Sequence, residues 1–439
     1  MIAPARAAAF EILLKVATTT AHSDDQLRSR EVDALSAQDR ALTTTLVLGT
    51  LRWQLKLDQR VRPLLARPAA RLDPAVKVAL RLGAYQILYL DRIPAHAAIC
   101  ESVELTKQAG ETFAAGMVNA VLRKLHGLPR ADSEDESTAE QFAHPRWIVD
   151  RWARFYSDEI AREICAFDQE PAAICLRLVH PDAEKALVDG GVELQPGDFL
   201  TAARRVVRGD VVRSEAFLRG WLRIQDEGSQ LVAELAGHGA RILDTCAAPG
   251  GKTAILAERN PEATITALDI SQRRLDEMRR NFAGDRVRFA VQDATTMRLQ
   301  PEYDLVLCDV PCTGTGTIVR NPEIRFRVNE EEIARQRRRQ VEILSRALHG
   351  LAPGGRLLYS TCSLEPEENE AVVFECCQQA REFQMVPWDE GVARIEREGV
   401  IHSQGAERLR ESALREGFLR TIPGIHACDG FFAALIVRK

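Results

Sequence analysis

The first 125 or so residues carry apolar side chains at three- to four-residue spacing, the period of a helix with one buried face. Five segments share this spacing: 6–16, 36–55, 80–90, 97–108 and 113–125. Ser36 opens the second of them, where its hydroxyl can cap a helix N-terminus. Short connections between amphipathic segments are typical of a helical bundle, so the pattern predicts an all-α, N-terminal domain over residues 1–130.

An acidic segment interrupts this pattern. Residues 131–140 hold five acidic residues, no basic residue and no large apolar one, so we predict a linker over 131–143. Apolar runs return from His144 onward, with extended-type stretches near 173–179 and 221–224. They predict a small α/β region over residues 144–235.

The period changes again near residue 240, where short apolar runs alternate with amphipathic segments. The predicted strands are 241–245, 263–269, 286–292, 304–308 and 355–361, and the predicted helices are 252–259, 271–282, 330–351 and 367–380. Strands that alternate with helices form a doubly wound, largely parallel sheet, so we predict a Rossmann-like α/β domain over 236–439. Two final runs, 418–421 and 430–437, fit an antiparallel hairpin at the edge of that sheet.

Composition agrees with several globular domains. The chain has 439 residues, of which 46% are hydrophobic and 28% charged. No stretch approaches the roughly 20 apolar residues of a membrane span, and the first 20 residues lack the apolar core of a secretory signal. We therefore expect a cytoplasmic monomer without membrane association.

The net charge of −5 is unevenly divided along the chain. Residues 1–130 contain 18 Lys and Arg against 12 Asp and Glu, a net of +6, and the remainder contains 40 against 51, a net of −11. A basic N-terminal domain suits a contact with phosphates, although a solvated helical surface explains the same excess equally well.

The segment Asp244–Thr253, with the sequence DTCAAPGGKT, follows one predicted strand and opens a helix. Ligands of open α/β sheets bind at the carboxyl ends of strands, and Gly250 with Gly251 would let a small molecule approach the backbone. Asp269 ends the next strand, where a carboxylate can accept hydrogen bonds from ribose hydroxyls. The segment lacks both the dinucleotide-binding G-x-G-x-x-G pattern and the first glycine of a P-loop. A ribose-bearing cofactor without a pyrophosphate therefore fits best.

Two more acidic residues follow predicted strands: Asp293 after the third and Asp309 after the fourth. The carboxyl ends of parallel strands meet at one edge, so the carboxylates at 244, 269, 293 and 309 are expected to converge on one crevice.

The ten cysteines include no C-x-x-C pair and no matching histidine spacing, so we predict no metal site. Most are expected to be buried thiols, including Cys308 within a strand and Cys376 and Cys377 within a helix. Cys312, in Asp-Val-Pro-Cys-Thr-Gly, and Cys362, in Ser-Thr-Cys-Ser, differ because each lies just beyond a predicted strand end. Both are expected at the same edge as the cofactor loop, which makes them candidates for chemistry.

Three motifs resemble those of the Sun-type RNA 5-methylcytosine methyltransferases: Asp244–Thr253, Asp309–Arg320 and Tyr359–Glu370. The stretches LRLGAYQIL from Leu80, ESVEL from Glu101 and VNAVLR from Val118 resemble the NusB-like domain that is fused to some members. The likeness runs through nearly the whole chain and keeps both domains in order.

This resemblance implies S-adenosylmethionine as cofactor. The loop Cys246, Ala247, Ala248, Pro249, Gly250, Gly251 and Lys252 would contact it through the backbone, Asp269 would bind the ribose, Asp293 would lie near the adenine, and Asp309 would lie near the methionine end and the target base. It further implies that Cys362 is the nucleophile and that Cys312 releases the product. Strand-end spacing alone does not order the two cysteines.

Two thiols suit this chemistry, because carbon 5 of cytosine is a poor nucleophile until a thiolate adds to carbon 6. Asp309 is the candidate to support protonation at N3, which would need a carboxyl pKa raised by a water-poor pocket. Cys312 is the candidate for the elimination that frees Cys362. Lys252 is a charge that could lower a thiol pKa, although a packing role fits it equally well.

The implied substrate is small-subunit ribosomal RNA with an unpaired or flipped-out target base. Candidate phosphate contacts are arginines that follow Cys312, namely Arg320, Arg325, Arg327, Arg335 and Arg337–Arg339, although a solvated helix face explains the later ones equally well. Trp147 and Trp152 could stack on bases, but a packing role is the stronger expectation.

Two alternatives remain open. The first is a cytosine-C5 methyltransferase of tRNA, another RNA or DNA; in the DNA case the Pro-Cys cysteine, Cys312, would attack. The second is a non-catalytic RNA-binding assembly factor with a vestigial methyltransferase domain, which would bind RNA but no cofactor.

Overall fold

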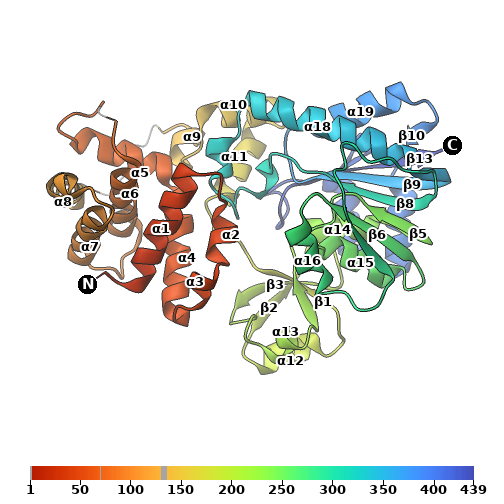
Figure 1. Ribbon diagram of the computed structural model, residues 1–439, viewed down its shortest axis with the longest axis horizontal. Helices are drawn as coiled ribbons and strands as arrows, with labels where there is room; N and C mark the ends of the chain where they lie inside the picture. The colour runs from red at the N-terminus through yellow and green to blue at the C-terminus, as the bar shows by residue number, and fades with distance from the viewer. Residues whose placement is uncertain (1, 70, 130–135) are drawn as a thin grey trace. The chain divides into compact units, whose positions relative to one another are not determined.

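The computed structural model describes residues 2–69, 71–129 and 136–439, and it divides into two compact units (Figure 1). The first comprises Met1–Pro171 with Ile318–Arg327, and the second Ala172–Thr317 with Val328–Lys439. The sequence assigned 144–171 to the small α/β region, whereas the structure groups these residues with the N-terminal helices. The predicted domain boundaries otherwise stay predictions.

The first unit is all-helical, as the apolar spacing predicts. Its main helices are α1 (Pro4–Thr18), α4 (Ala37–Arg52), α5 (Gln54–Val61), α6 (Pro74–Tyr89), α7 (Ala95–Gln108), α8 (Ala115–His126), α10 (Arg146–Phe155) and α11 (Asp158–Phe167); the short helices are α2 (Ser23–Leu27), α3 (Arg30–Asp33) and α9 (Thr138–Gln141). Their apolar faces form one core around Leu46, Leu80 and Leu122, all at most 1% exposed. The predicted cap at Ser36 is confirmed, because its hydroxyl accepts from the Asp39 N–H at 3.1 Å.

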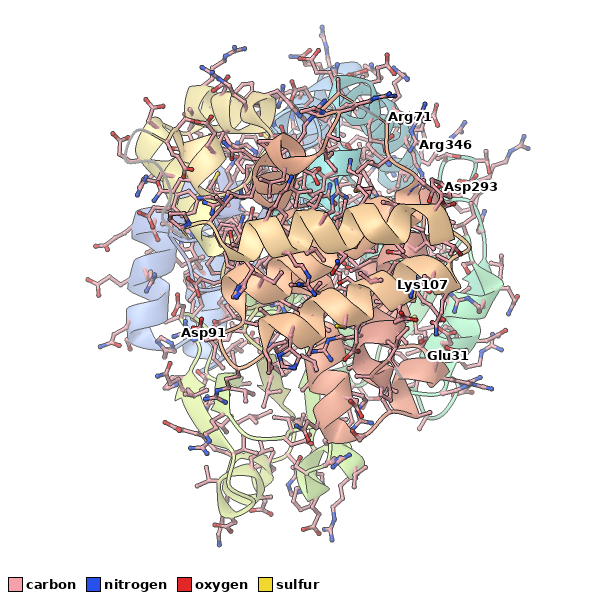
Figure 2. All side chains as sticks on the ribbon, turned by 90° about the vertical axis from the view of Figure 1, so that its left-hand side faces the viewer. Glu31, Arg71, Asp91, Lys107, Asp293 and Arg346 are labelled. Atoms are coloured by element: carbon pink, nitrogen blue, oxygen red, sulfur yellow. The ribbon has the colours of Figure 1, made fainter. Side chains whose placement is uncertain are left out.

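Charged side chains of both signs cover the outside of this unit, where Figure 2 labels Glu31, Arg71, Asp91 and Lys107 among the sticks. Lys107 of α7 pairs with Glu104 at 2.6 Å on the exposed helix surface. Surface pairs of this kind agree with the interpretation of the basic excess as a solvated surface, at least in part.

Part of the predicted linker is helical, namely the short helix α9 within residues 136–143. Residues 131–135 lie outside the described residues, and Ser137 caps α9 in a reciprocal capping box with Glu140.

Two of the predicted phosphate-binding arginines, Arg325 and Arg327, belong to the first unit; Arg325 is buried, so the prediction is wrong for it, and Arg327 is half-buried. Arg325 is fully buried, and its guanidinium donates to the carbonyl of Ala143 at 3.3 Å. Arg327 donates to the carbonyls of Val16 and Ala21 at 3.0 and 2.7 Å. A guanidinium whose N–H groups donate to backbone carbonyls has fewer donors left for phosphates. Trp152 is 0% exposed, which confirms its packing role.

The second unit begins with a small antiparallel sheet in the order β2-β3-β1-β4. Its strands are β1 (Cys175–Leu178), β2 (Glu193–Pro196), β3 (Ala203–Arg208) and β4 (Leu222–Ile224), with α12 (Ala183–Asp189) and α13 (Glu215–Leu218) beside them. The strands predicted near 173–179 and 221–224 are confirmed as β1 and β4.

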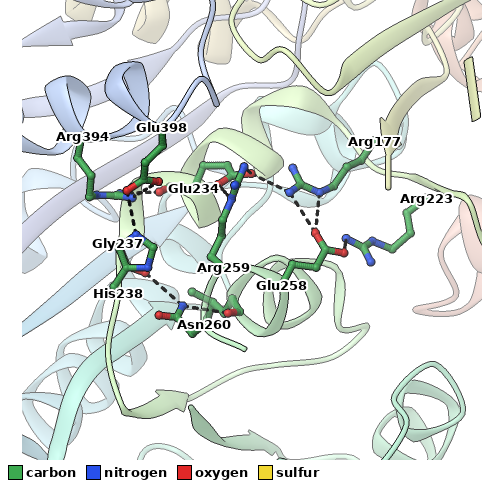
Figure 3. Close-up of polar contacts among 11 residues, drawn as sticks. Arg177, Arg223, Glu234, Gly237, His238, Glu258, Arg259, Asn260, Arg394 and Glu398 are labelled. Atoms are coloured by element: carbon green, nitrogen blue, oxygen red, sulfur yellow. Dashed lines mark hydrogen bonds and ion pairs between the residues drawn. The ribbon is translucent and has the colours of Figure 1, made fainter. Parts of the chain in front are cut away.

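Ion pairs join this small sheet to the rest of the unit (Figure 3). Arg177 of β1 is 4% exposed and lies 2.8 Å from Glu234 of α14 (Glu227–Ala236) and 3.1 Å from Glu258 of α15 (Gly251–Arg259). Arg259 meets Glu234 from the other side at 2.6 Å. Removing one partner would leave a buried charge unpaired, so the network fixes how the small sheet packs.

The large sheet has the order β11-β12-β13-β9-β8-β5-β6-β7, and β10 pairs with β13. Its strands are β5 (Arg241–Asp244), β6 (Thr264–Asp269), β7 (Val287–Val291), β8 (Tyr303–Asp309), β9 (Leu351–Thr361), β10 (Phe383–Met385), β11 (Leu414–Arg415), β12 (Phe418–Thr421) and β13 (Phe431–Arg438). Strands β5 to β9 pair in parallel, and β12 with β13 add the predicted antiparallel hairpin. The predicted Rossmann-like, largely parallel fold is confirmed.

Both faces of this sheet are buried, because alternate residues of each central strand point to opposite sides. Ile242, Leu305 and Leu307 join a core with α14, α15 and α16 (Gln272–Arg279). Leu243 and Val306 join another with α18 (Glu330–His349) and α19 (Glu370–Gln379). Figure 1 shows these two helical layers on either side of the sheet.

The order of the strands in the large sheet indicates where along its edge a ligand would bind. The chain runs outward from β5 through β6 to β7, then returns to β8 beside β5 and continues outward to β9. The order reverses between β5 and β8, and the crevice at such a switch point is where open α/β sheets bind ligands. Asp244 and Asp309 end the two strands that flank it.

Candidate active site at the carboxyl edge of the large sheet

The loop between β5 and α15 is held close to β6. The Ala247 N–H donates to the carbonyl of Leu268 at 2.7 Å, and the Ala248 N–H donates to Asp269 Oδ2 at 3.3 Å. Gly250 has a φ of +104°, and a Cβ there would lie 2.7 Å from the Met278 side chain. Only glycine combines this φ with this close approach, so the loop depends on it.

A crevice of about 310 Å³ opens beside this loop. Five of the predicted cofactor residues line it: Cys246, Ala248, Asp269, Asp293 and Asp309. The other predicted ones, Ala247, Pro249, Gly250, Gly251 and Lys252, shape the loop or lie beside the crevice without lining it. The strand-end argument therefore brings carboxylates of β6, β7 and β8 to one cavity.

Sequence reasoning gave Arg339 another role, a contact with RNA phosphates, and missed the remaining lining residues: Thr245, Ile270, Arg274, Gln292, Ala294, Val310, Pro311 and Ile343. Most of these residues directly precede or follow a strand-end residue that the sequence analysis had selected. They could have been predicted from that adjacency. Ile270, which is 56% exposed, adds an apolar surface beside Asp269.

The two outer carboxylates differ in their partners. Asp269 is 4% exposed, and accepts from the Ser271 N–H at 2.9 Å and from Arg274 at 3.1 Å. Asp293 is half-buried and accepts from the side chain and the N–H of Thr295 at 2.7 and 2.9 Å. These hydrogen bonds lower the pKa of Asp293, so its carboxylate is ionised at neutral pH.

Asp244 lies beneath the crevice and does not line it. It is 1% exposed, and its Oδ2 accepts from Thr253 at 2.6 Å while its Oδ1 has no hydrogen-bond partner among the described residues. Burial raises the pKa of Asp244 to about 7. A buried carboxylate oxygen without a donor marks a place where a positively charged or hydrogen-bonding group would be stabilised.

The two cysteines singled out by the sequence meet at this edge. Cys312, in the Cys312 loop (310–317) after β8, and Cys362, in the Cys362 loop (362–369) after β9, have Sγ atoms 3.3 Å apart. Both are partly exposed, whereas Cys308 is 0% and Cys376 2% exposed, as expected for packing residues. The hydrogen bond to Cys362 and burial raise the pKa of Cys312 well above its usual range.

A charged pair lies beside the thiols. Lys252 Nζ is 2.7 Å from Asp309 Oδ2, and Ser360 donates to Asp309 Oδ1 at 2.7 Å. The Lys252 ammonium also lies 5.0 Å from the centre of the Phe431 ring. Burial alone would lower the pKa of Lys252, but the charge of Asp309 and its hydrogen bond outweigh burial and raise that pKa, so Lys252 is a cation.

The arginines of α18 have different surroundings. Arg335 pairs with Glu332 and Arg337 with Glu375, each at 2.7 Å. Arg339 lines the crevice, which makes it the best placed of them to meet a ligand there. No group of three or more metal-ligating side chains occurs among the described residues, and none of the helices in that part of the chain is long and apolar enough to cross a membrane.

Comparisons with known proteins agree with this geometry. The chain matches the 16S rRNA methyltransferase RsmB/F family over residues 234–437 and the NusB family over residues 3–126. The two matches fall on the large-sheet part and on the helical N-terminal part.

Curated relatives cover nearly the whole chain. It is 32% identical to the probable ribosomal RNA small subunit methyltransferase B of Bacillus subtilis, over 98% of each chain. It is 31% identical to ribosomal RNA small subunit methyltransferase B of Salmonella arizonae, over 92% of this chain and 91% of that one.

Solved structures share the fold. The crystal structure of PH0851 covers 99% of both chains with a TM-score of 0.80 at 24% identity. A methyltransferase homologue from Pyrococcus horikoshii has a TM-score of 0.54 at 25% identity, over 69% of this chain and 98% of its own. The family models and the curated relatives confirm the family that the motifs indicated: the chain belongs to the RsmB/F family of small-subunit ribosomal RNA methyltransferases.

Proposed function

We propose that this enzyme methylates carbon 5 of a specific cytosine in small-subunit (16S) ribosomal RNA, with S-adenosylmethionine as methyl donor and through a covalent bond from Cys362 to carbon 6. The observation that carries the proposal is the pair of thiols 3.3 Å apart, beside a charged Lys252–Asp309 pair and a crevice that Asp309 also lines. The ribosomal target follows from the names of the relatives.

The crevice fits S-adenosylmethionine on its own features. Asp269 can accept from ribose hydroxyls, Ile270 offers an apolar surface to the adenine, and Asp293 can accept from an exocyclic amine. The carboxylate of Asp309, which lines the crevice, suits a ligand that carries positive charge. When bound, the cofactor supplies an electrophilic methyl group on a sulfonium.

The first half of the reaction uses Cys362, Lys252 and Asp309. The Cys362 thiolate adds to carbon 6, which makes carbon 5 electron-rich enough to take the methyl group. The positive charge of the Lys252 ammonium interacts with Cys362. Asp309 can accept a hydrogen bond from protonated N3 or the amino group of the base, and so holds the ring in place.

The second half needs a base. The carbon-5 proton must leave as the electron pair reforms the ring double bond and expels Cys362. Cys312 is the nearest candidate, since its sulfur lies 3.3 Å from that of Cys362. Once Cys362 is bonded to carbon 6 and carries no charge, Cys312 can lose its own proton to solvent and then take the carbon-5 proton directly or through a water molecule.

Substrate binding involves an RNA base that is unpaired or turned out of its helix, because a stacked base cannot reach the thiols. The NusB-family region would add RNA affinity, and Arg339 is placed to meet substrate or cofactor at the crevice.

Methylation of small-subunit ribosomal RNA tests this function. Incubation of the purified protein with naked 16S RNA or small subunits and labelled S-adenosylmethionine should transfer label to one cytosine, located by bisulfite mapping. Transfer to tRNA or DNA instead would favour the other cytosine-C5 methyltransferases. RNA binding without any heat of cofactor binding in a calorimetric titration would favour the non-catalytic assembly factor.

A further inference from the structure

Glu368 is a buried carboxylate that the mechanism above does not use. It precedes α19, and it is 0% exposed. Its Oε1 accepts from the Thr313 N–H and from the Gln340 side chain, each at 2.9 Å. Its Oε2 accepts from the hydroxyl of Ser363 at 2.5 Å and from that of Thr313. Burial raises the pKa of Glu368, while these four donated hydrogen bonds oppose that shift and favour the ionised carboxylate.

Two of the donors sit directly beside the two reactive cysteines. Thr313 follows Cys312, and Ser363 follows Cys362, so one carboxylate joins the loops that carry both thiols. The main chain joins them as well, because the Gly316 N–H donates to the carbonyl of Cys362 at 2.9 Å. The loops therefore keep a second connection if Glu368 is changed.

The charges around the two thiols are of opposite sign. All hydrogen-bond partners of Glu368 among the described residues are neutral, so its charge is not cancelled by an ion pair. After the hydrogen bond to Cys362 and burial, the charges of Cys362 and Glu368 are the next causes that raise the pKa of Cys312. Cys362, in contrast, interacts with the positive charge of Lys252.

We propose that Glu368 is a positioning residue that assigns the two thiols their roles. Its hydrogen bonds hold the Cys312 loop against the Cys362 loop, and its negative charge keeps the proton on Cys312. Two thiolates 3.3 Å apart would repel strongly, so the two thiols do not ionise together, and the negative charge of Glu368 disfavours ionisation of Cys312. This inference rests on the proposed function, which needs one nucleophile and one releasing group.

Alkylation of the free protein tests this without RNA or cofactor. Iodoacetamide reacts with thiolates, and mass spectrometry resolves its rate at each cysteine as the pH is raised. The wild-type protein should alkylate Cys362 at lower pH than Cys312. The other titratable groups around the thiols, Lys252, Asp309 and Tyr359, are kept in every variant.

Glu368→Gln removes the charge and keeps the shape. The Cys312 profile should then move to lower pH by about one unit, a roughly tenfold faster reaction at neutral pH. Thr313→Val is the matched control, since it removes one hydroxyl donor and leaves the charge in place, so the Cys312 profile should stay. Glu342→Gln changes an exposed carboxylate of α18 and should alter neither cysteine.

The inference is overturned if Cys312 in the wild-type protein alkylates at the lower pH, a result that needs no variant. It is also overturned if folded Glu368→Gln, checked by its melting temperature, leaves the Cys312 profile unchanged, or if Thr313→Val moves it as far as Glu368→Gln does. None of these three outcomes would contradict methylation through Cys362. Failure of the proposed function would instead show as no methyl transfer with the alkylation order intact.

Discussion

The crevice proposed for the cofactor and the cysteine pair share one edge of one sheet and the side chain of Asp309, yet most of the other residues that build them differ. The crevice is lined by residues at or next to the ends of β6, β7 and β8, with the loop after β5. The cysteine pair depends on residues that come from elsewhere: Lys252 from the start of α15, Gln340 from α18 and Glu368 before α19. Changes in one half should therefore spare the function of the other.

The halves also differ in how charge is compensated. In the cysteine half, Asp309 has a cation at 2.7 Å. Asp244, beneath the crevice, has one oxygen without a donor. We expect a ligand to compensate the remaining negative charge in the crevice half. The cysteine half has its charges compensated without a ligand.

The largest expected effect is on how the free energy of unfolding depends on pH. Burial raises the pKa of Asp244 from 3.8 to about 7, so the folded chain keeps a proton that the unfolded chain releases between these values. The stability this proton contributes is complete below pH 3.8 and is lost as pH rises towards 7, by roughly 4 kcal/mol. Asp244→Asn should remove that loss, so cofactor-free melting curves of the two proteins should diverge between pH 5 and 8. Parallel curves would show that Asp244 has a normal pKa.

The next effect breaks the cysteine half alone. Lys252→Met removes the cation that pairs with Asp309 and interacts with Cys362, and should slow methylation roughly 100-fold. Cofactor affinity by calorimetry should change little, because Lys252 does not line the crevice. Lys185→Met, an exposed control on α12, should leave both unchanged. Loss of cofactor binding in Lys252→Met would contradict the separation of the halves.

The smallest effect breaks the crevice half alone. Asp269→Asn weakens charge-assisted hydrogen bonds to ribose hydroxyls, and should raise the Kd of S-adenosylmethionine about tenfold. Alkylation of Cys362 in the free protein should stay as in the wild type. Asp276→Asn, an exposed change on α16, is the control. An unchanged Kd in Asp269→Asn would remove this residue from the cofactor site.

The comparison also marks what sequence can predict. Alternating apolar runs located β5 to β9, and the carboxyl ends of parallel strands must meet, so Asp269, Asp309 and both cysteines could be brought to one edge in advance. The same reasoning could not find Glu368. Its donors lie at positions 313, 340 and 363, and no local pattern connects such distant residues.

Other failures have equally physical causes. Arg325 is of the residue type that binds phosphates, which is why the sequence predicted that role. Nothing in the neighbouring sequence indicates that its guanidinium is buried and donates to backbone carbonyls. Strands β2 and β3 were missed because neither shows an alternating apolar pattern. In β2, residues Glu193–Pro196 are mostly exposed.

The central claim is that Cys362 attacks and Cys312 releases, and a denaturing gel tests it most directly. With 16S RNA and S-adenosylmethionine, Cys312→Ala should accumulate a covalent protein–RNA complex that resists denaturation, because the adduct forms but is not released. Cys362→Ala should form none and should lose methylation by a factor of roughly 1000 or more. A covalent complex that persists in Cys362→Ala and disappears in Cys312→Ala would reverse the two roles and contradict the account.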